Sequence, residues 1–504
     1  PKARFELKSH TIRCERVEFI DVGDARIYPP DKVVTVRKKA KMDAFDGAEI
    51  LANNITKYHK IKEAHVEIFA RRKYLANGLY AYTDSHGGEQ MITFEKIELD
   101  TAYQTVATGV IPQEANFSLS DKFDFYGTAE LRAAEQFLTF DGATRINHEC
   151  NQFARNWLKF RTDIDPNNIQ IPVSENMKDL EGNGIAVGLV KRNSSDPDSL
   201  GIYPAFLSAL DGADDDILFT SHGFLNFNEG AQEFRIASKE KLINRADTGN
   251  YISLHVESCS MEGDGEVDLA IKIPDLEVKS YGTVKYDNAT KTTSMNISGS
   301  INFFYDKKAA QYMTDGILAA EGISGIDFGR TTLEQAIREE VSKEEAENIK
   351  SDYTLKGEVK KLPKEMDDVI YFTNIRLEWD ERAGGFVSKP ISGVVGVYGT
   401  PVMKDFTVRM SIEYGEAGTR GMKFGYLVEL PPVEERPGDY FLYRFQRIKK
   451  DTELSVCTSN KELVEYILAM KEDKKKQGKL AYDAASKTKT TTFMSEFKRW
   501  WDGE

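Results

Sequence analysis

The sequence predicts a mainly β protein. We expect several stacked antiparallel β-sheet units of the β-sandwich, jelly-roll or β-solenoid kind, with short helical insertions and a helical C-terminal tail. Three observations lead to this fold class: apolar and polar residues alternate over long stretches, glycine-containing turns separate these stretches, and one tripeptide recurs. Successive side chains of a strand point to opposite faces, so such alternation indicates a strand with one buried face.

The alternating stretches recur along the whole chain. They lie at 64–70, 267–273, 295–303, 375–379 and 406–414. Short turn sequences stand between such stretches, at Asp141-Gly142, Gly182-Asn183-Gly184, Asp211-Gly212, Asp264-Gly265 and Gly384-Gly385. Because Gly and Asn accept the positive φ that tight hairpin turns require, these sequences predict strand reversals and therefore antiparallel sheets.

A tripeptide repeat indicates one β unit copied several times. Tyr-Gly-Thr occurs at 126–128, 281–283 and 398–400, and the first two copies continue in step as Tyr-Gly-Thr-Ala-Glu-Leu and Tyr-Gly-Thr-Val-Lys-Tyr.

Three segments have helical spacing of their apolar residues: 306–320, a segment from Thr331 to Lys350 that opens with a Thr331/Glu334 capping box, and 460–476. The Thr/Lys-rich stretch 487–492 is interpreted as a linker. The resulting domain organisation is an N-terminal β-repeat region (1–175), a middle β-repeat region (176–304), a helical insertion (305–350), a C-terminal antiparallel β domain (351–450) and a helical tail (451–504).

Composition indicates more than one domain and a main partner other than nucleic acid. The chain has 504 residues, 40% of them hydrophobic, and single cores rarely exceed roughly 250 to 300 residues. Its formal net charge of −14 disfavours a polyanion, because nucleic-acid binding depends on neutralising phosphates. No stretch approaches ~18 uninterrupted apolar residues, so we expect no transmembrane span. The start at Pro1, without a methionine, suggests a trimmed piece.

The cysteines and the acidic residues supply the metal and redox candidates. The four cysteines lie far apart, which favours buried free thiols. Asp211, Asp214 and Asp216 are the candidate metal ligands, with Asp196 and Asp198 in a preceding loop, because Ca²⁺ prefers several loop carboxylates. Calcium is the one cofactor considered. The spacing does not match an EF-hand loop, and a solvated acidic turn is the alternative interpretation.

No catalytic residue is predicted. The sequence has no His-Glu-x-x-His, Gly-x-Ser-x-Gly, Walker or Gly-x-Gly-x-x-Gly motif, so the usual signatures of metal-dependent hydrolysis, acyl transfer, NTP chemistry and dinucleotide binding are missing from it. We therefore expect a protein that is not an enzyme.

The C-terminal tail is the candidate partner-binding element. Phe493, Met494, Phe497, Trp500 and Trp501 share one stripe of a predicted helix, and all but Met494 are predicted partner-binding residues. The alternatives are that this helix folds back onto its own domain, occupies a groove of a partner, or lies on a membrane surface.

Three stretches resemble known envelope proteins. Residues 129–146 and 224–236 resemble the "apolar strand, turn, apolar strand" unit of OstA-like lipopolysaccharide-transport domains, and 157–173 is similar to stretches of large uncharacterised envelope proteins of Bacteroidota. No diagnostic motif accompanies them, so no functional residue is transferred. The resemblance implies an elongated stack of β layers whose edges or grooves contact other envelope components.

The expected function is therefore that of a non-catalytic extracytoplasmic scaffold or binding protein, periplasmic or on the cell surface, in an envelope assembly or transport complex with envelope proteins as partners. The alternatives are a carbohydrate-binding or carbohydrate-active β protein and a lipid carrier with an apolar β groove, so a glycan or lipid ligand stays open.

Overall fold

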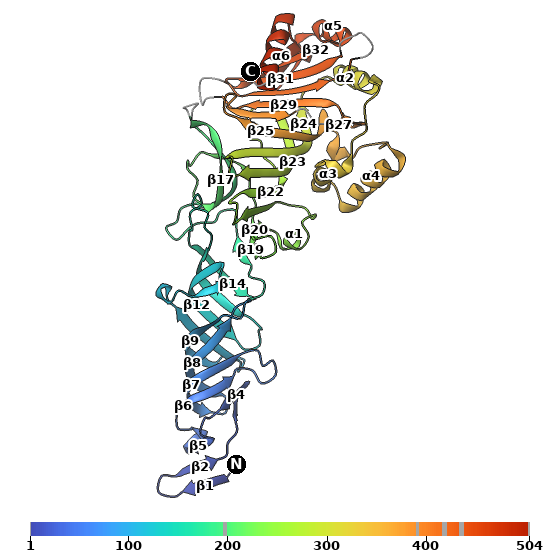
Figure 1. The fold of residues 1–504 in the computed structure, drawn as a ribbon. Helices are drawn as coiled ribbons and strands as arrows, with labels where there is room; N and C mark the ends of the chain where they lie inside the picture. Colours follow the sequence, from blue (N-terminus) through green and yellow to red (C-terminus); the bar gives the residue numbers. More distant parts are fainter. Residues whose placement is uncertain (1, 195–198, 390–392, 416–420, 433–437, 502–504) are drawn as a thin grey trace. The chain divides into compact units, whose positions relative to one another are not determined.

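In the computed structural model of the chain, residues 2–194, 199–389, 393–415, 421–432 and 438–501 are described (Figure 1), except for the side chains of 330 and 498–501. The chain is mainly β, with 49% strand and 16% helix, as predicted. It divides into two compact units, residues 1–185 with 224–227, and residues 186–223 with 228–504. No helix of the described ranges is both long and apolar enough to cross a membrane.

The first unit contains two sheets. A small sheet has the order β1-β2-β5, and a large one has the order β14-β13-β12-β10-β9-β8-β7-β6-β4-β3, with β11 paired to β12. The strands of this unit are β1 (Lys2–Glu6), β2 (Thr11–Glu15), β3 (Ile20–Val22), β4 (Ala25–Tyr28), β5 (Val33–Val36), β6 (Phe45–Leu51), β7 (Lys60–Ala70), β8 (Lys73–Thr83), β9 (Glu89–Leu99), β10 (Thr105–Ile111), β11 (Ser118–Ser120), β12 (Phe123–Arg132), β13 (Leu138–Ile146), β14 (Leu158–Ile164) and β15 (Ile171–Val173).

The alternation that predicted strand 64–70 places one face of β7 in the core. Ala64, Val66 and Ile68 are at most 1% exposed. Further along the same unit, the rings of Phe125 and Phe140 pack edge to face, with 5.0 Å between their centroids. Burial of one face of each strand accounts for the regular period of two in this part of the sequence.

The second unit contains a small sheet of order β17-β16-β18 and a large sheet in which β20 to β34 follow one another mostly in chain order. Most neighbours are antiparallel, whereas β32 and β34 pair in parallel. The strands are β16 (Ala186–Arg192), β17 (Gly201–Ser208), β18 (Asp216–Phe219), β20 (Glu233–Ala237), β21 (Tyr251–His255), β22 (Met261–Glu266), β23 (Leu276–Asp287), β24 (Thr292–Phe303), β25 (Ile370–Asp380), β26 (Gly385–Lys389), β27 (Gly393–Val397), β28 (Thr400–Lys404), β29 (Thr407–Glu413), β30 (Lys423–Glu429), β31 (Tyr440–Ile448), β32 (Asp451–Thr458), β33 (Lys476–Gln477) and β34 (Leu480–Ala484), while β19 (Gly223–Asn228) spans the division between the units.

The helices are α1 (Lys239–Ile243), α2 (Lys307–Ala319), α3 (Leu333–Glu340), α4 (Lys343–Lys356), α5 (Lys461–Ala469) and α6 (Lys487–Trp501). Each of the three predicted helical segments contains a helix, but the second is divided into α3 and α4, which together run to Lys356, and the third ends at Ala469 instead of 476. Asp306 caps α2 by accepting from two backbone N–H groups, whereas α3 begins one residue later than the Thr331 capping box predicts. The linker predicted at 487–492 is wrong, because these residues form the first turns of α6.

Four predicted β features differ from the structure. The turns predicted at Asp141-Gly142 and Asp264-Gly265 lie inside β13 and β22, where glycine is needed because neighbouring atoms leave no room for a Cβ. Residues 267–273 are not a strand: Val267 donates to Ser280 O and Asp268 to Leu218 O, and Ala270 has φ +48°. Val267, Leu269 and Ile273 are buried and Ile271 is half-buried, so here the alternation reflects burial without the hydrogen-bond ladder of a strand. The Tyr-Gly-Thr repeat is not one structural unit either, because the copies at 126–128 and 281–283 lie within β12 and β23, while the copy at 398–400 lies at the turn between β27 and β28.

The predicted domain ranges do not coincide with the two units. The division falls near residue 185 and around 223–228, and the range 451–504, expected as a helical tail, also contains β32, β33 and β34.

Candidate functional site

The small sheet of the first unit carries the clearest candidate binding surface. β1 pairs antiparallel with β2, and β2 with β5 (Figure 1). Opposite residues of an antiparallel pair share a face. One face therefore carries only apolar residues and a cysteine, and we call it the apolar N-terminal face: Ala3, Phe5, Ile12, Cys14, Val34 and Val36.

This face is covered at β5 and open at β1. Val34 on β5 is 4% exposed, whereas Ile12 on β2 is 39% and Phe5 on β1 is 57% exposed. Every residue of β1 is exposed. Cys14 is a half-buried free thiol on the same face. An exposed apolar surface of this kind marks an interaction site more often than an isolated exposed side chain does.

The opposite face of this sheet is polar, and two positive charges lie directly opposite one another on it. Arg4 stands directly opposite Arg13, and Lys2 directly opposite Glu15. Glu15 Oε1 lies 3.8 Å from Arg13 Nε, too far for a direct hydrogen bond. Like charges directly opposite one another on a sheet are destabilising. The acidic residues of this face, Glu6 on β1 and Glu15 on β2, each lie two residues along the strand from an arginine and not directly opposite one.

The two edges of the sheet differ. The outer side of β5 is occupied by the segment that follows it. The backbone N–H of Asp43 donates to Thr35 O at 3.0 Å, and Met42 forms a β-bridge with Val36. Among the described residues, β1 pairs only with β2, so its outer edge is open. An open edge presents unpaired backbone N–H and C=O groups that can pair with another chain.

The sequence contains a signal for this surface, but in a stretch much shorter than those from which strands were predicted. Ala3 and Phe5 alternate with Lys2, Arg4 and Glu6, which is the period of two expected of a strand.

The predicted metal ligands do not converge on a cation site. Asp211 accepts from Arg192 at 2.6 Å, and Asp216 lies 3.1 Å from Lys191 and 2.6 Å from Lys272. Buried Lys191 and its neighbours thus already neutralise Asp216, whose pKa is lowered by hydrogen bonds from Lys272, Asn193 and Lys191 against the opposing effect of burial. Asp214 contributes its backbone carbonyl to Asn193. No group of three potential metal ligands occurs within the described residues, and Asp196 and Asp198 lie outside them.

The tail helix packs on its own unit through the residues predicted to bind a partner. Phe497 is fully buried in a cluster with Leu427, Leu442 and Cys457, and Phe493 is partly buried against it. Buried Arg444 lies beside both rings and forms ion pairs with Glu413 and Glu496. The packing of Phe493 and Phe497 therefore agrees with the alternative in which the helix folds back onto its own domain. The side chains of Trp500 and Trp501 lie outside the described part.

The cysteines fall into two classes. Cys14 and Cys457 are free, and Cys457 is buried as predicted. The prediction of free thiols is wrong for Cys150 and Cys259, which are disulfide-bonded. Wide spacing in the sequence does not reveal such a bond, because tertiary structure decides which cysteines can be bridged.

Acidic side chains with buried carboxylate oxygens lie together at the end of α3. Tyr371 donates to Glu340 Oε2 at 3.2 Å, while Glu340 Oε1 and Asp368 Oδ2 are buried without hydrogen-bond partners. Burial, and then the neighbouring Asp368 and Glu365 carboxylates, raise the pKa of Glu340 to about 7, against the lowering effect of Tyr371 and Lys279. The position at a helix C-terminus also disfavours negative charge. The unpaired oxygens are inaccessible to solvent, so this cluster is a source of pH sensitivity and not an open reaction site.

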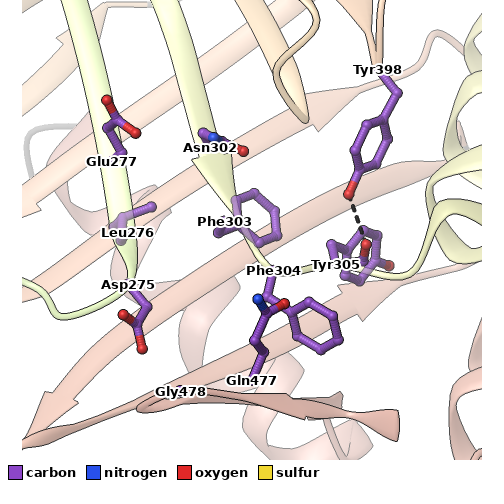
Figure 2. Close-up of a pocket in the computed structure, with 10 residues that line it drawn as sticks. All are labelled: Asp275, Leu276, Glu277, Asn302, Phe303, Phe304, Tyr305, Tyr398, Gln477 and Gly478. Carbon is purple, nitrogen blue, oxygen red and sulfur yellow. Dashed lines mark hydrogen bonds between the residues drawn. The ribbon is translucent and has the colours of Figure 1, made fainter.

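An open cavity lies where β23 begins and β24 ends (Figure 2). It has a volume of about 520 Å³, within the usual range for small-ligand sites. Its lining mixes aromatic, amide and carboxylate side chains: Asp275, Leu276, Glu277, Asn302, Phe303, Phe304, Tyr305, Tyr398, Gln477 and Gly478. Tyr398 donates to Tyr305 O at 2.7 Å, which fixes one wall, and Asp275 accepts from the backbone of Lys479.

No family model, curated protein or solved structure matches the chain. The resemblance to envelope proteins therefore stays a prediction, and the surfaces above are the basis for the function.

Proposed function

We propose that this chain is a non-catalytic extracytoplasmic binding protein of an envelope assembly, and that it docks another protein, of acidic surface, on the apolar N-terminal face. The observation that carries the proposal is the exposure of that face at β1 and β2. A small sheet needs a packed hydrophobic face to be stable in water, and here the described residues cover Phe5 and Ile12 only in part.

The energetics favour coverage by a partner. Complete burial of a side chain such as Phe or Ile contributes about 1.5–3 kcal/mol. Because Phe5 is 57% and Ile12 39% exposed, covering both would recover roughly half of that contribution for each. Such a gain is a useful part of a protein interface, in which a few buried anchors supply most of the affinity.

The charge of this region favours an acidic partner. Residues 2–16 carry five basic and two acidic side chains, while the whole chain has a formal net charge of −14. A basic segment on an acidic protein attracts an acidic partner surface and speeds its association. The extracytoplasmic location is supported by Cys150 and Cys259, because disulfides persist mainly in oxidising compartments.

A charge placed on the apolar face tests this function. Tagged wild-type protein and the variants Phe5→Asp and Leu355→Asp are purified from the cell of origin. Leu355 is 79% exposed on α4 and serves as the control for adding a carboxylate to an exposed apolar position. We expect wild type and Leu355→Asp to carry envelope proteins in stoichiometric amounts, and Phe5→Asp to be recovered alone. Recovery of the wild type as a monodisperse monomer, or of Phe5→Asp with the full set of partners, would contradict the proposal.

The cavity in Figure 2 favours carbohydrate binding as a second candidate function. Half-buried Phe304 offers a ring face, and Asn302 and Gln477 offer amides that donate and accept hydrogen bonds. We expect a glycan that binds the wild type on an array to bind Phe304→Ala at least about tenfold more weakly, since one buried aromatic contact contributes about 1.5–3 kcal/mol. Phe19→Ala, which truncates a 42% exposed ring of the first unit, is the control. The absence of any bound glycan, or equal binding by Phe304→Ala, would remove this candidate.

A further inference from the structure

We infer that the partner contributes an extended strand, which pairs with the open edge of β1 and alternates acidic with apolar side chains. The inference rests on the proposed function and names the chemistry of the partner. It is carried by the placement of three features on one strand: an unpaired edge, a polar face with Lys2, Arg4 and Glu6, and an apolar face with Ala3 and Phe5.

The edge determines the shape of the partner segment. β1 is the terminal strand of its sheet, and the other end of the sheet is closed by Met42 and Asp43. In an edge strand, every second residue directs its N–H and C=O away from the sheet. An extended segment laid along β1 satisfies these groups by main-chain hydrogen bonds, which is the physical basis of strand addition.

The charges determine half of the added side chains. On the polar face, Lys2, Arg4 and Glu6 would each lie beside a residue of the added strand, and Arg4 already faces Arg13. Acidic side chains suit the positions beside Lys2 and Arg4, whereas the position beside Glu6 disfavours one. An acidic side chain next to Arg4 relieves the repulsion between the two arginines, because opposite charges on neighbouring strands stabilise a sheet. A basic side chain there would place a third positive charge beside them.

The apolar face determines the other half. Side chains of the added strand that alternate with the acidic ones fall beside Ala3 and Phe5, where β1 is fully open. They would extend the apolar N-terminal face by one strand and cover part of the Phe5 ring. The expected segment therefore has the pattern acidic–apolar–acidic–apolar beside residues 2–5 of β1, with a residue that is not acidic beside Glu6.

Other occupants fit less well. A second copy of the chain that added its own β1 antiparallel, with the two Arg4 residues opposite one another, would pair Lys2 with Glu6 but would also bring both Arg4 side chains together beside Arg13. An anionic lipid surface would attract the basic residues and accept Phe5 and Leu7, but it cannot pair the backbone of the β1 edge. The charges on β1 deter general edge pairing, and the same charges select an acidic strand.

Three synthetic peptides test the inference with the full chain. The probe alternates Val and Glu over about nine residues, the second peptide alternates Val and Lys, and the third has the composition of the probe with its Val and Glu residues in separate blocks. Binding is measured by fluorescence anisotropy, and the backbone protection of β1 by hydrogen exchange. We expect the alternating Val/Glu peptide to bind at least about tenfold more tightly than either other peptide and to protect amides of β1.

A charge reversal provides the sharper comparison. In Arg4→Glu we expect the preference to shift from the Val/Glu to the Val/Lys peptide, while Phe5→Asp weakens both. Arg376→Glu, at an exposed position of β25 in the second unit, is the matched control and should leave the preference unchanged. Equal binding of the alternating peptides, binding without protection of β1, or an unchanged preference in Arg4→Glu would overturn the inference.

Two further results would also overturn it in favour of another occupant. These are concentration-dependent self-association that Phe5→Asp abolishes, and binding to phosphatidylglycerol vesicles that depends on both Phe5 and Arg4. If Phe5→Asp loses its envelope partners in the purification above while the peptides show no charge preference, the docking function stands and only the acidic strand is wrong.

Discussion

Phe497→Ala is expected to release the C-terminal helix α6 from the second unit and to lower the free energy of unfolding of that unit by about 4 kcal/mol, because the loss of a fully buried phenyl group leaves a cavity. Phe497 is 0% exposed and packs on Leu427, Leu442 and Cys457. Denaturant unfolding measures the stability, and hydrogen exchange of the α6 amides measures the docking of the helix.

Two comparisons make this prediction specific. Phe493→Ala removes a partly buried ring of the same helix and should cost clearly less. Gly425→Ala should undock α6 as Phe497→Ala does, because a Cβ at Gly425 would lie 2.4 Å from the Phe497 ring. Unchanged protection of α6 in Phe497→Ala would show that other contacts hold the helix and would contradict the role of Phe497 as its main anchor.

Glu340→Gln is expected to stabilise the second unit at pH 8 by about 2 kcal/mol, a value discounted for the partial exposure of the side chain. The pKa of Glu340 is raised from 4.5 to about 7, chiefly by burial. The folded state therefore binds this proton more tightly than the unfolded state does. The destabilisation is present above pH 7 and is relieved as the pH falls from about 7 towards 4.5.

Thermal unfolding at pH 8 and pH 5 measures this effect. The wild type should gain stability on acidification through this group, whereas Glu340→Gln should lose that part of the pH dependence and differ little from wild type at pH 5. Glu358→Gln, at an exposed position, serves as the control. A Glu340→Gln variant that is less stable than wild type at pH 8 would show that the charged carboxylate is needed, contrary to this account.

The strands were predictable where burial of one face and a regular ladder coincide. The stretches 295–303 and 406–414 fall on β24 and β29, since local alternation and tertiary pairing agree there. At 267–273 they disagree, because Ala270 has a positive φ and the backbone bonds reach Ser280 and Leu218. Side-chain burial can therefore alternate without a strand, and the sequence pattern alone does not separate the two cases.

The candidate sites were less predictable, because their chemistry depends on distant residues. The sequence makes Asp216 a plausible calcium ligand. In the folded chain, however, Lys272, which is 56 residues away, donates a hydrogen bond to it at 2.6 Å. Phe493, Met494 and Phe497 of the predicted stripe do pack together, but nothing in the tail itself says that Phe497 enters the cluster of Leu427 and Leu442. The alternation in β1 is visible in the sequence, whereas the lack of cover on Phe5 is a property of the folded unit.

The reactivity of Cys14 tests the docking face most directly. This free thiol lies on the apolar N-terminal face and is half-buried in the chain alone, so its rate of alkylation by N-ethylmaleimide reports whether the face is covered. In the intact envelope assembly we predict alkylation at least about tenfold slower than in the purified chain, with the rate restored by Phe5→Asp. Equal rates in the assembly and in the purified chain would contradict the docking of a protein on this face.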